Sequence, residues 1–270
     1  MTLKGKIQLH GQTDTGSVRD HNEDAIVYDD DIALAILADG MGGHRGGEMA
    51  SAITVSTVLE EITDKVKNLT VGETDNDTGY SAESLIVQEA INLANKNVHD
   101  SSESNARYRG MGTTIVVVLF YDNRFTVAHV GDSRLYRLRN GELKQITSDH
   151  SLMREMIDRG LYTPEEARKS LNNNLITRAI GIDSKVQVDI QEDIAMVNDI
   201  YLLCSDGVTD MIEDDLIKSV MIENSENLEK AASEIIRLAN EHGGKDNISA
   251  LLAKPIKSFP AKNSLFSRFF

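Results

Sequence analysis

Acidic residues recur beside glycines in this chain, at the ends of apolar, strand-like runs. The pattern has four members: Asp39-Gly40-Met41-Gly42-Gly43, Gly131-Asp132-Ser133-Arg134, Asp206-Gly207 and Lys245-Asp246-Asn247. A fifth acidic segment runs from Arg19 to Asp24. Carboxylates at strand ends can meet at one place in a fold, and converging carboxylates repel one another unless a cation lies among them. The pattern therefore predicts a metal-dependent enzyme, and hard oxygen ligands favour Mg²⁺ or Mn²⁺ over Zn²⁺.

Composition narrows the class of protein further. The 270 residues are 40% hydrophobic and carry a net charge of −15, which argues against a nucleic-acid partner because phosphates require basic surfaces. The single cysteine, Cys204, allows no intramolecular disulfide and fits a reducing compartment. The longest apolar runs, Ile32–Ala38 and Ile115–Phe120, are far shorter than the ~20 residues of a membrane-spanning helix. We therefore expect a cytoplasmic protein without a signal peptide or transmembrane segment.

The order of elements indicates the fold class. Apolar runs predict strands at Lys6–Gln12, Ala25–Asp29, Ile32–Ala38, Thr113–Phe120, Phe125–Val130, Leu135–Leu138, Val186–Ile190, Ile200–Cys204 and Ile248–Ala253. Helical spacing predicts helices at Gly46–Val66, Ser81–Val98, Asp214–Ile222 and Asn227–Glu241. Helices inserted in pairs disfavour a doubly wound parallel sheet and favour antiparallel sheets with helices packed outside. We expect one domain over residues 1–253.

The last residues, 254–270, differ from the body. They contain Lys254, Lys257, Lys262 and Arg268, no acid, and four phenylalanines: Phe259, Phe266, Phe269 and Phe270. One interpretation is a frayed terminus. The other is a basic, Phe-rich segment that docks on a partner or an anionic membrane surface.

Taken together and in order, the motifs resemble one family. The order is Arg-x-x-Asn-Glu-Asp, Asp-Gly-Met-Gly-Gly, Gly-Thr-Thr at 112–114, Gly-Asp-Ser-Arg, Leu-Ile-Thr-Arg-Ala-Ile-Gly at 175–181, Ser-Asp-Gly-Val at 205–208 and Lys-Asp-Asn. Each motif alone is weak, but the set resembles the metal-dependent Ser/Thr protein phosphatases of type 2C (the PPM family) in their short bacterial form. The resemblance runs from about Gln8 to Ala253. It implies an α+β fold, a four-layer α-β-β-α sandwich of two antiparallel sheets flanked by helices.

The resemblance also implies roles for individual residues. Asp39 would bridge two metal ions, the Gly40 carbonyl would bind one of them, and Asp206 and Asp246 would ligate the first. Glu23 would hold waters of the second ion. The remaining implied roles belong to Asp132, which with Asp206 would hold a third, weaker ion, and to Arg19, which would clamp the substrate phosphate. Catalysis would then depend on Arg19, Asp39 and Asp206, with two or three Mn²⁺ or Mg²⁺ ions per chain.

The implied reaction is hydrolysis of phosphoserine and phosphothreonine by a metal-bridging hydroxide, which would reverse the action of a bacterial Ser/Thr kinase. No side-chain nucleophile is needed, and we expect Cys204 to be a core strand residue. Animal members carry His after the Asp-Gly pair as a candidate general acid, whereas this chain has Met41. His44 lies three residues on but fits a turn or surface histidine better than an acid, so the proton donor stays open, and a metal-bound water could serve.

Three alternatives remain at this stage. The chain could be a non-catalytic phosphoprotein-binding scaffold, which its retained acids disfavour, or could act on a small phosphate ester or a phosphorylated anti-sigma factor. Residues 147–174 resemble the flap over the metal cleft, where Arg154, Arg159, Arg168 and Lys169 could steer acidic phosphopeptides or be ordinary surface charges. Asp20, His21 and Asp24 are expected to be surface groups or to support the ligands. We expect a monomer that meets phosphorylated proteins and a cognate kinase.

Overall fold

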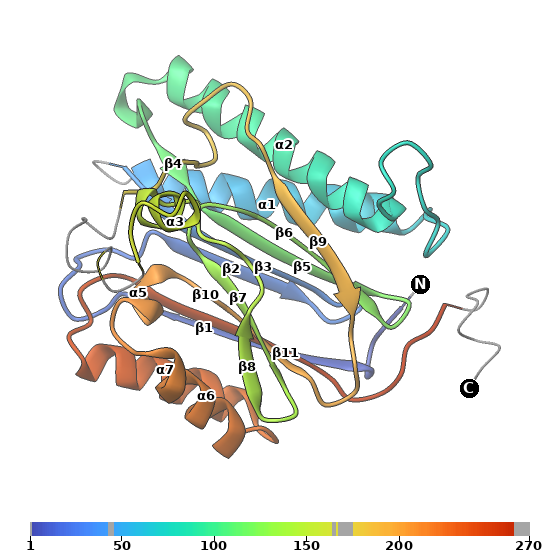
Figure 1. Cartoon of the computed structure of the whole chain (residues 1–270). Coiled ribbons are helices and arrows are strands. Elements are labelled where there is room, and N and C mark those ends of the chain that lie inside the picture. The colour runs from blue at the N-terminus through green and yellow to red at the C-terminus, as the bar shows by residue number, and fades with distance from the viewer. Residues whose placement is uncertain (1, 43–45, 164–165, 167–174, 262–270) are drawn as a thin grey trace.

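Two antiparallel sheets packed face to face, with helices on both outer faces, form the body of the protein in the computed structural model (Figure 1). The structure describes residues 2–42, 46–163, 166 and 175–261. One sheet has the strand order β1-β11-β10-β7-β8 and the other β2-β3-β5-β6-β9, with β4 paired to β3. The predicted four-layer α-β-β-α sandwich is confirmed.

The first sheet contains β1 (Ile7–Asp14), β7 (Arg134–Arg139), β8 (Glu142–Gln145), β10 (Ile200–Cys204) and β11 (Ile248–Pro255). The second contains β2 (Asp24–Asp29), β3 (Leu34–Met41), β5 (Ile115–Tyr121), β6 (Arg124–Val130) and β9 (Asp189–Ile194), beside β4 (Gly112–Thr113). The helices are α1 (Gly46–Val66), α2 (Ala82–Ser104), α3 (Leu152–Asp158), α5 (Asp206–Thr209), α6 (Asp214–Glu223) and α7 (Leu228–Glu241), and a 3₁₀ turn, η1, spans Ala106–Tyr108.

The alternation of side chains along each strand builds three hydrophobic cores, one at each boundary between layers. In β5, Ile115, Val117 and Leu119 face α1 and α2, whereas the residues between them face the other sheet. In β10, Leu202 and Cys204 face α6 and α7, and Tyr201 and Leu203 face the sheet opposite. Successive strand residues point to opposite faces, so a strand buried on both faces needs a continuous apolar run. This explains why these strands could be predicted.

The edge strands were harder to predict. β9 pairs only with β6 and has the sequence DIQEDI, so the strand lies later than the predicted Val186–Ile190. Val188 is buried in the loop before it. β8 (ELKQ) pairs only with β7 and was not predicted at all. Both strands are half exposed and polar. Their sequences therefore contain no continuous apolar run by which they could be predicted.

The folded body extends beyond the predicted boundary after Ala253. β11 continues to Pro255, and the buried Lys254 donates to Glu226 at 2.8 Å. Phe259 is 1% exposed and packs in the core between the sheets, and its backbone N–H donates to Asn123 at 2.6 Å. The Ala261 N–H donates to Asp122 at 2.7 Å. Residues 254–261 are therefore part of the domain, and Lys262, Phe266, Arg268, Phe269 and Phe270 lie outside the described residues.

No helix within the described ranges has the length and apolar character needed to cross a bilayer.

Replacing Phe259 tests its contribution to the core. We expect Phe259→Ala to lower the free energy of unfolding by about 3–5 kcal/mol, because the ring is fully buried beside Phe120 and its loss leaves a cavity. Urea unfolding with circular dichroism measures this change. As a control, Ile222→Ala at a half-exposed site should cost far less. Equal stability of the Phe259 variant and the parent would contradict this placement.

Candidate metal centre

Asp24 and Asp39 face each other at one end of the sandwich. β2 begins at Asp24 where β3 ends, and the two residues are direct partners across the antiparallel pair. In the other sheet, β11 begins where β10 ends, so Asp206 and Asp246 reach the same end. The antiparallel pairing of both sheets thus gathers strand ends, and the acids that follow them, at one place.

Asp24 ties the two sheets together beneath this cluster. Its Oδ2 accepts hydrogen bonds from the Ser205 hydroxyl at 2.9 Å and the Ser249 hydroxyl at 2.6 Å. Ser249 lies in β11 and Ser205 directly follows β10, so both come from the side of the opposite sheet. Its other oxygen, Oδ1, is buried and has no hydrogen-bond partner among the described residues. Asp24 therefore positions Asp39 from below, although its sequence context predicted only a surface or supporting group.

The Gly-Thr-Thr motif holds the backbone of Asp39. The Asp39 N–H donates to the Thr114 hydroxyl at 3.0 Å, and the Asp39 carbonyl accepts from the Thr113 hydroxyl at 2.7 Å and the Thr114 N–H at 2.8 Å. The Thr114 hydroxyl also lies 2.7 Å from the Ser133 hydroxyl, beside Asp132. These bonds leave the Asp39 carboxyl free to face the cluster.

Close backbone approach explains the glycines that follow Asp39 and Asp206. A Cβ on Gly40 would lie 2.2 Å from the Gly47 carbonyl oxygen, and one on Gly207 would lie 1.9 Å from the Asn247 carbonyl oxygen. Any side chain at either position would force the backbone apart. The glycines therefore allow the two turns to pack directly against their neighbours.

Glu23 packs beside the N-terminal turn of α1. Its backbone carbonyl accepts from the Gly40 N–H at 3.1 Å and from the Ser51 hydroxyl at 2.6 Å, and its carboxylate accepts from the backbone N–H of Glu48 in the first helical turn. A helix N-terminus stabilises negative charge. Even so, burial raises the pKa of Glu23 above its usual range, against the lowering effect of Arg19.

Repulsion dominates the electrostatics of the cluster. Burial raises the pKa of Asp39 well above its usual range, and four negative neighbours raise it further: Asp24, Asp206, Asp132 and Asp246. Burial likewise raises the pKa of Asp206 well above its usual range, followed by the charges of Asp132, Asp210, Asp246 and Asp24. Burial raises the pKa of Asp132 and that of Asp24 to about 6. Without a bound cation, these carboxyls therefore keep their protons to higher pH than ordinary aspartates do.

The donor set fits hard divalent cations. Asp206 has a buried oxygen, Oδ1, without a hydrogen-bond partner among the described residues. Carboxylate oxygens are ligands for Mg²⁺ and Mn²⁺, and a positive ion would remove the repulsion that raises these pKa values. The structure brings together all the predicted ligands: Glu23, Asp39, Gly40, Asp132, Asp206 and Asp246.

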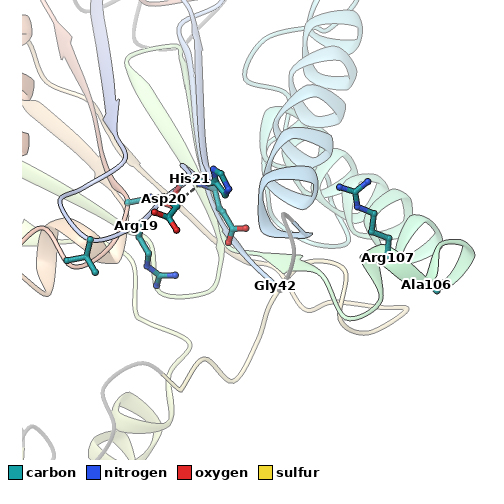
Figure 2. A pocket seen from close by; sticks show the side chains of 9 residues that line it. Arg19, Asp20, His21, Gly42, Ala106 and Arg107 are labelled. Carbon is teal, nitrogen blue, oxygen red and sulfur yellow. Dashed lines mark hydrogen bonds between the residues drawn. The ribbon is translucent and has the colours of Figure 1, made fainter.

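Two cavities flank the carboxylates. One of about 820 Å³ is lined by Arg19, Glu23 and Asn247, and Figure 2 shows Arg19, Asp20 and His21 on one side of it. The other, of about 630 Å³, is lined by Asp132, Asp206 and Asp246. Arg19 Nη2 donates to Asp246 Oδ2 at 2.6 Å. The predicted phosphate clamp thus lies at the edge of the cluster.

Asn247 joins three segments around the site. Its Oδ1 accepts from the Glu23 N–H at 2.8 Å, and its Nδ2 donates to the carbonyls of Thr15 at 2.9 Å and His21 at 2.8 Å. The sequence showed Asn247 only as the end of the Lys-Asp-Asn motif. Its importance comes from long-range contacts with the Arg19–Asp24 segment, which local sequence does not reveal.

A second group of possible ligands, His129, His150 and Asp189, does not fit a cation. His150 Nδ1 accepts the Gly131 N–H at 3.1 Å, so in the neutral ring Nε2 carries the hydrogen and faces Asp189 Oδ2 at 3.3 Å. Burial lowers the pKa of His150 to about 4, which keeps the ring neutral. His150 instead supports the turn before Asp132, because its own N–H also donates to the Gly131 carbonyl at 2.9 Å.

The remaining residues named from the sequence, where the structure describes them, are not part of the carboxylate cluster. Cys204 is fully buried in β10, as expected, and Asp20 and His21 are exposed. Arg154 lies 3.0 Å from Asp158 and Arg159 lies 3.5 Å from Glu155, so both basic groups pair within their own helical segment. Arg159 is thus an exposed, paired surface charge, whereas Arg154 also lines the cavity of Asp132 and Asp206, so its steering role stays a prediction. Arg168, Lys169 and His44 lie outside the described residues.

Known proteins are similar to this chain in sequence and in fold. The family described as Protein phosphatase 2C matches residues 15–253. The serine/threonine phosphatase stp of Listeria monocytogenes is 35% identical over 246 residues, covering 90% of this chain and 94% of that protein. The Mycobacterium tuberculosis serine/threonine phosphatase PstP/Ppp has a TM-score of 0.80 at 33% identity, covering 94% of this chain and 99% of the other. The catalytic domain of PstP in complex with two manganese ions has a TM-score of 0.79 at 33% identity, covering 93% and 99%.

The raised pKa values predict how stability depends on pH without metal. A carboxyl whose pKa is higher in the folded chain than in the unfolded chain, where it is about 3.9, stabilises the fold fully below that value. This contribution is lost as the pH rises through about 6 for Asp24 and Asp132, and at higher pH for Asp39 and Asp206. Metal-free Asp206→Asn should therefore melt about 3–6 °C above the metal-free parent at pH 7.5, with a smaller gap at pH 4.

Thermal melting in chelator measures this gap. Asp183→Asn, an exposed site outside the cluster, is the matched control and should leave the melting temperature unchanged. A metal-free Asp206→Asn that melts below the parent at pH 7.5 would show that repulsion does not dominate there.

Proposed function

This chain belongs to the protein phosphatase 2C family and is a metal-dependent serine/threonine protein phosphatase, and we propose that the carboxylate cluster is its active site. The supporting observation is the convergence of Asp39, Asp206 and Asp246, with raised pKa values for the first two, beside the guanidinium of Arg19. A buried set of repelling acids is costly unless a cation compensates it. A scaffold without catalysis would have no use for such a set.

The cluster would hold two or three Mn²⁺ or Mg²⁺ ions. Asp39 would bridge two ions, with the Gly40 carbonyl on one of them and Asp206 and Asp246 on the first. Glu23 would hold waters of the second ion, and Asp132 with Asp206 would hold a third. A relative of similar fold, the PstP catalytic domain in complex with two manganese ions, supports this assignment. When bound, such ions supply a water of lowered pKa and neutralise the charge of the phosphate.

The chain's own residues would position the phosphate. Arg19 would turn from Asp246 to the phosphate oxygens, because a guanidinium can offer two parallel donors to them. Asn247 holds the Glu23 backbone and the His21 carbonyl, so it fixes the segment that carries Arg19. Position 41 carries Met, so no side chain at that position donates a proton to the leaving alkoxide.

The substrates are phosphoproteins, and the enzyme would reverse the action of a bacterial serine/threonine kinase as a cytoplasmic monomer. Similarity to the Listeria phosphatase and a single, buried cysteine support this setting. The catalytic domain would extend to Ala261. Any docking role of the basic tail would then rest on residues 262–270. Gel filtration tests the monomeric state, and cell fractionation with antibody detection tests the cytoplasmic location.

Metal removal tests the active site. Chelator-stripped protein should not hydrolyse a phosphothreonine peptide, and added Mn²⁺ should restore hydrolysis. Asp39→Asn and Asp206→Asn should each reduce kcat by about 100-fold or more, because each removes a ligand that the reacting geometry requires. The Asp183→Asn control should keep full activity. Mn²⁺-dependent activity that survives in both site variants would contradict the assignment.

Asn247→Ala tests whether the hydrogen bonds of Asn247 support the metal site. We expect a loss of about 10–100-fold in Mn²⁺ affinity or in kcat/KM, since partners that orient ligands typically contribute that much. Asn247→Asp keeps the accepting oxygen for the Glu23 N–H but loses the donor to Thr15 and His21, so it should lie between Ala and the parent. Unchanged Mn²⁺ binding and kcat/KM in Asn247→Ala would remove this role.

A further inference from the structure

Arg107 is an exposed arginine that has no acidic partner among the residues the structure describes, in a strongly acidic protein. Within the described ranges, every arginine other than Arg107 and Arg109 has a carboxylate oxygen within 4.0 Å. The nearest described group that Arg107 faces is the Tyr108 ring, whose centroid lies 5.9 Å from the guanidinium carbon. In a chain with a net charge of −15, a cation left unpaired beside a cavity is available to a ligand.

Arg107 shares the cavity of the proposed phosphate clamp. Arg107 and Ala106 line the same space of about 820 Å³ as Arg19 and Glu23. Figure 2 shows Arg19 and Arg107 on opposite sides of this cavity. Arg109, which is also exposed, is not among the residues that line it. The two unpaired arginines thus differ in their access to the site.

The turn that carries Arg107 is fixed relative to the carboxylates. The Asn105 side chain caps the turn by accepting the Arg107 N–H at 3.1 Å, and Tyr108 packs against the core below α1 and α2. Met111 is 1% exposed, and the next residues, Gly112 and Thr113, pair with Met41 and Gly40 of β3. Arg107 therefore stands at a defined place relative to Asp39, while its own side chain stays free.

Charge within the cavity decides what Arg107 can bind. Asp20 lines the cavity on the side of Arg19 in Figure 2, and Glu23 also lines it within electrostatic reach of Arg19, so these acids repel any further acid of a substrate there. We propose that Arg107 forms a second anion subsite, which takes the carboxylate of an aspartate or glutamate close to the phosphorylated residue of a substrate protein. This inference rests on the proposed function, because it requires the phosphate to bind near Arg19. Arg154 and Arg159 are weaker candidates, since each already has a carboxylate partner.

Paired peptides test this subsite. Three phosphothreonine peptides would be compared with Mn²⁺ at low salt: one neutral, one with glutamates on the N-terminal side and one with glutamates on the C-terminal side. The parent should prefer one acidic peptide over the neutral one by about three- to fivefold in kcat/KM, the size of an exposed ion pair. The preference should shrink as salt rises.

Three variants test whether Arg107 is responsible for this preference. Arg107→Ala should abolish the preference, Arg107→Lys should keep most of it because the charge remains, and Arg109→Ala should leave it at the parental value. A preference that is unchanged in Arg107→Ala, that falls equally in Arg109→Ala, or that is absent from the parent overturns the subsite. Melting temperatures of the exposed-site variants should match the parent, which separates loss of binding from loss of folding. Failure of the parent to hydrolyse any peptide with Mn²⁺ would instead overturn the proposed function.

Discussion

Repulsion among half-buried carboxylates is the constraint around which this molecule is organised. Asp39 lies within the electrostatic reach of Asp24, Asp132, Asp206 and Asp246, and each charge makes the next harder to form. The hydroxyls of Ser205 and Ser249 offset this repulsion only in part at Asp24, and the guanidinium of Arg19 bonds Asp246 at the rim. A divalent cation relieves it at once, so the same feature that destabilises the empty site gives the site its affinity for metal.

The sandwich supplies the rigidity that this arrangement needs. Strand ends from both sheets meet at one end, and Asp24, Ser205 and Ser249 connect the sheets directly below the acids. The three hydrophobic cores fix the distance between layers, and Thr113 and Thr114 fix the backbone of Asp39. Stability of the layers and geometry of the site are therefore linked through the same strands.

Much of this could be predicted from sequence. Strands buried on both faces, such as β5 and β10, show as continuous apolar runs, and the acids beside glycines mark the turns that meet at the site. Polar edge strands such as β8 and β9 leave no such signal, and the packing of Phe259 depends on partners that are distant in sequence. The roles of Asn247 and Arg107 were missed for a related reason, and Asp24 was expected only to be a surface or supporting group: each role depends on contacts, or on their absence, that exist only after folding.

Proton release on metal binding is the direct test of whether the carboxylates of the cluster repel one another. Calorimetric titration of Mn²⁺ into chelator-stripped protein, in buffers with different heats of ionisation, counts the protons displaced per chain. If the carboxylates are protonated because they repel one another, binding must displace those protons. We predict clear release at pH 6 and less at pH 8, because fewer protons remain on these carboxyls at the higher pH before the metal binds. Mn²⁺ binding with no proton release at either pH would contradict it.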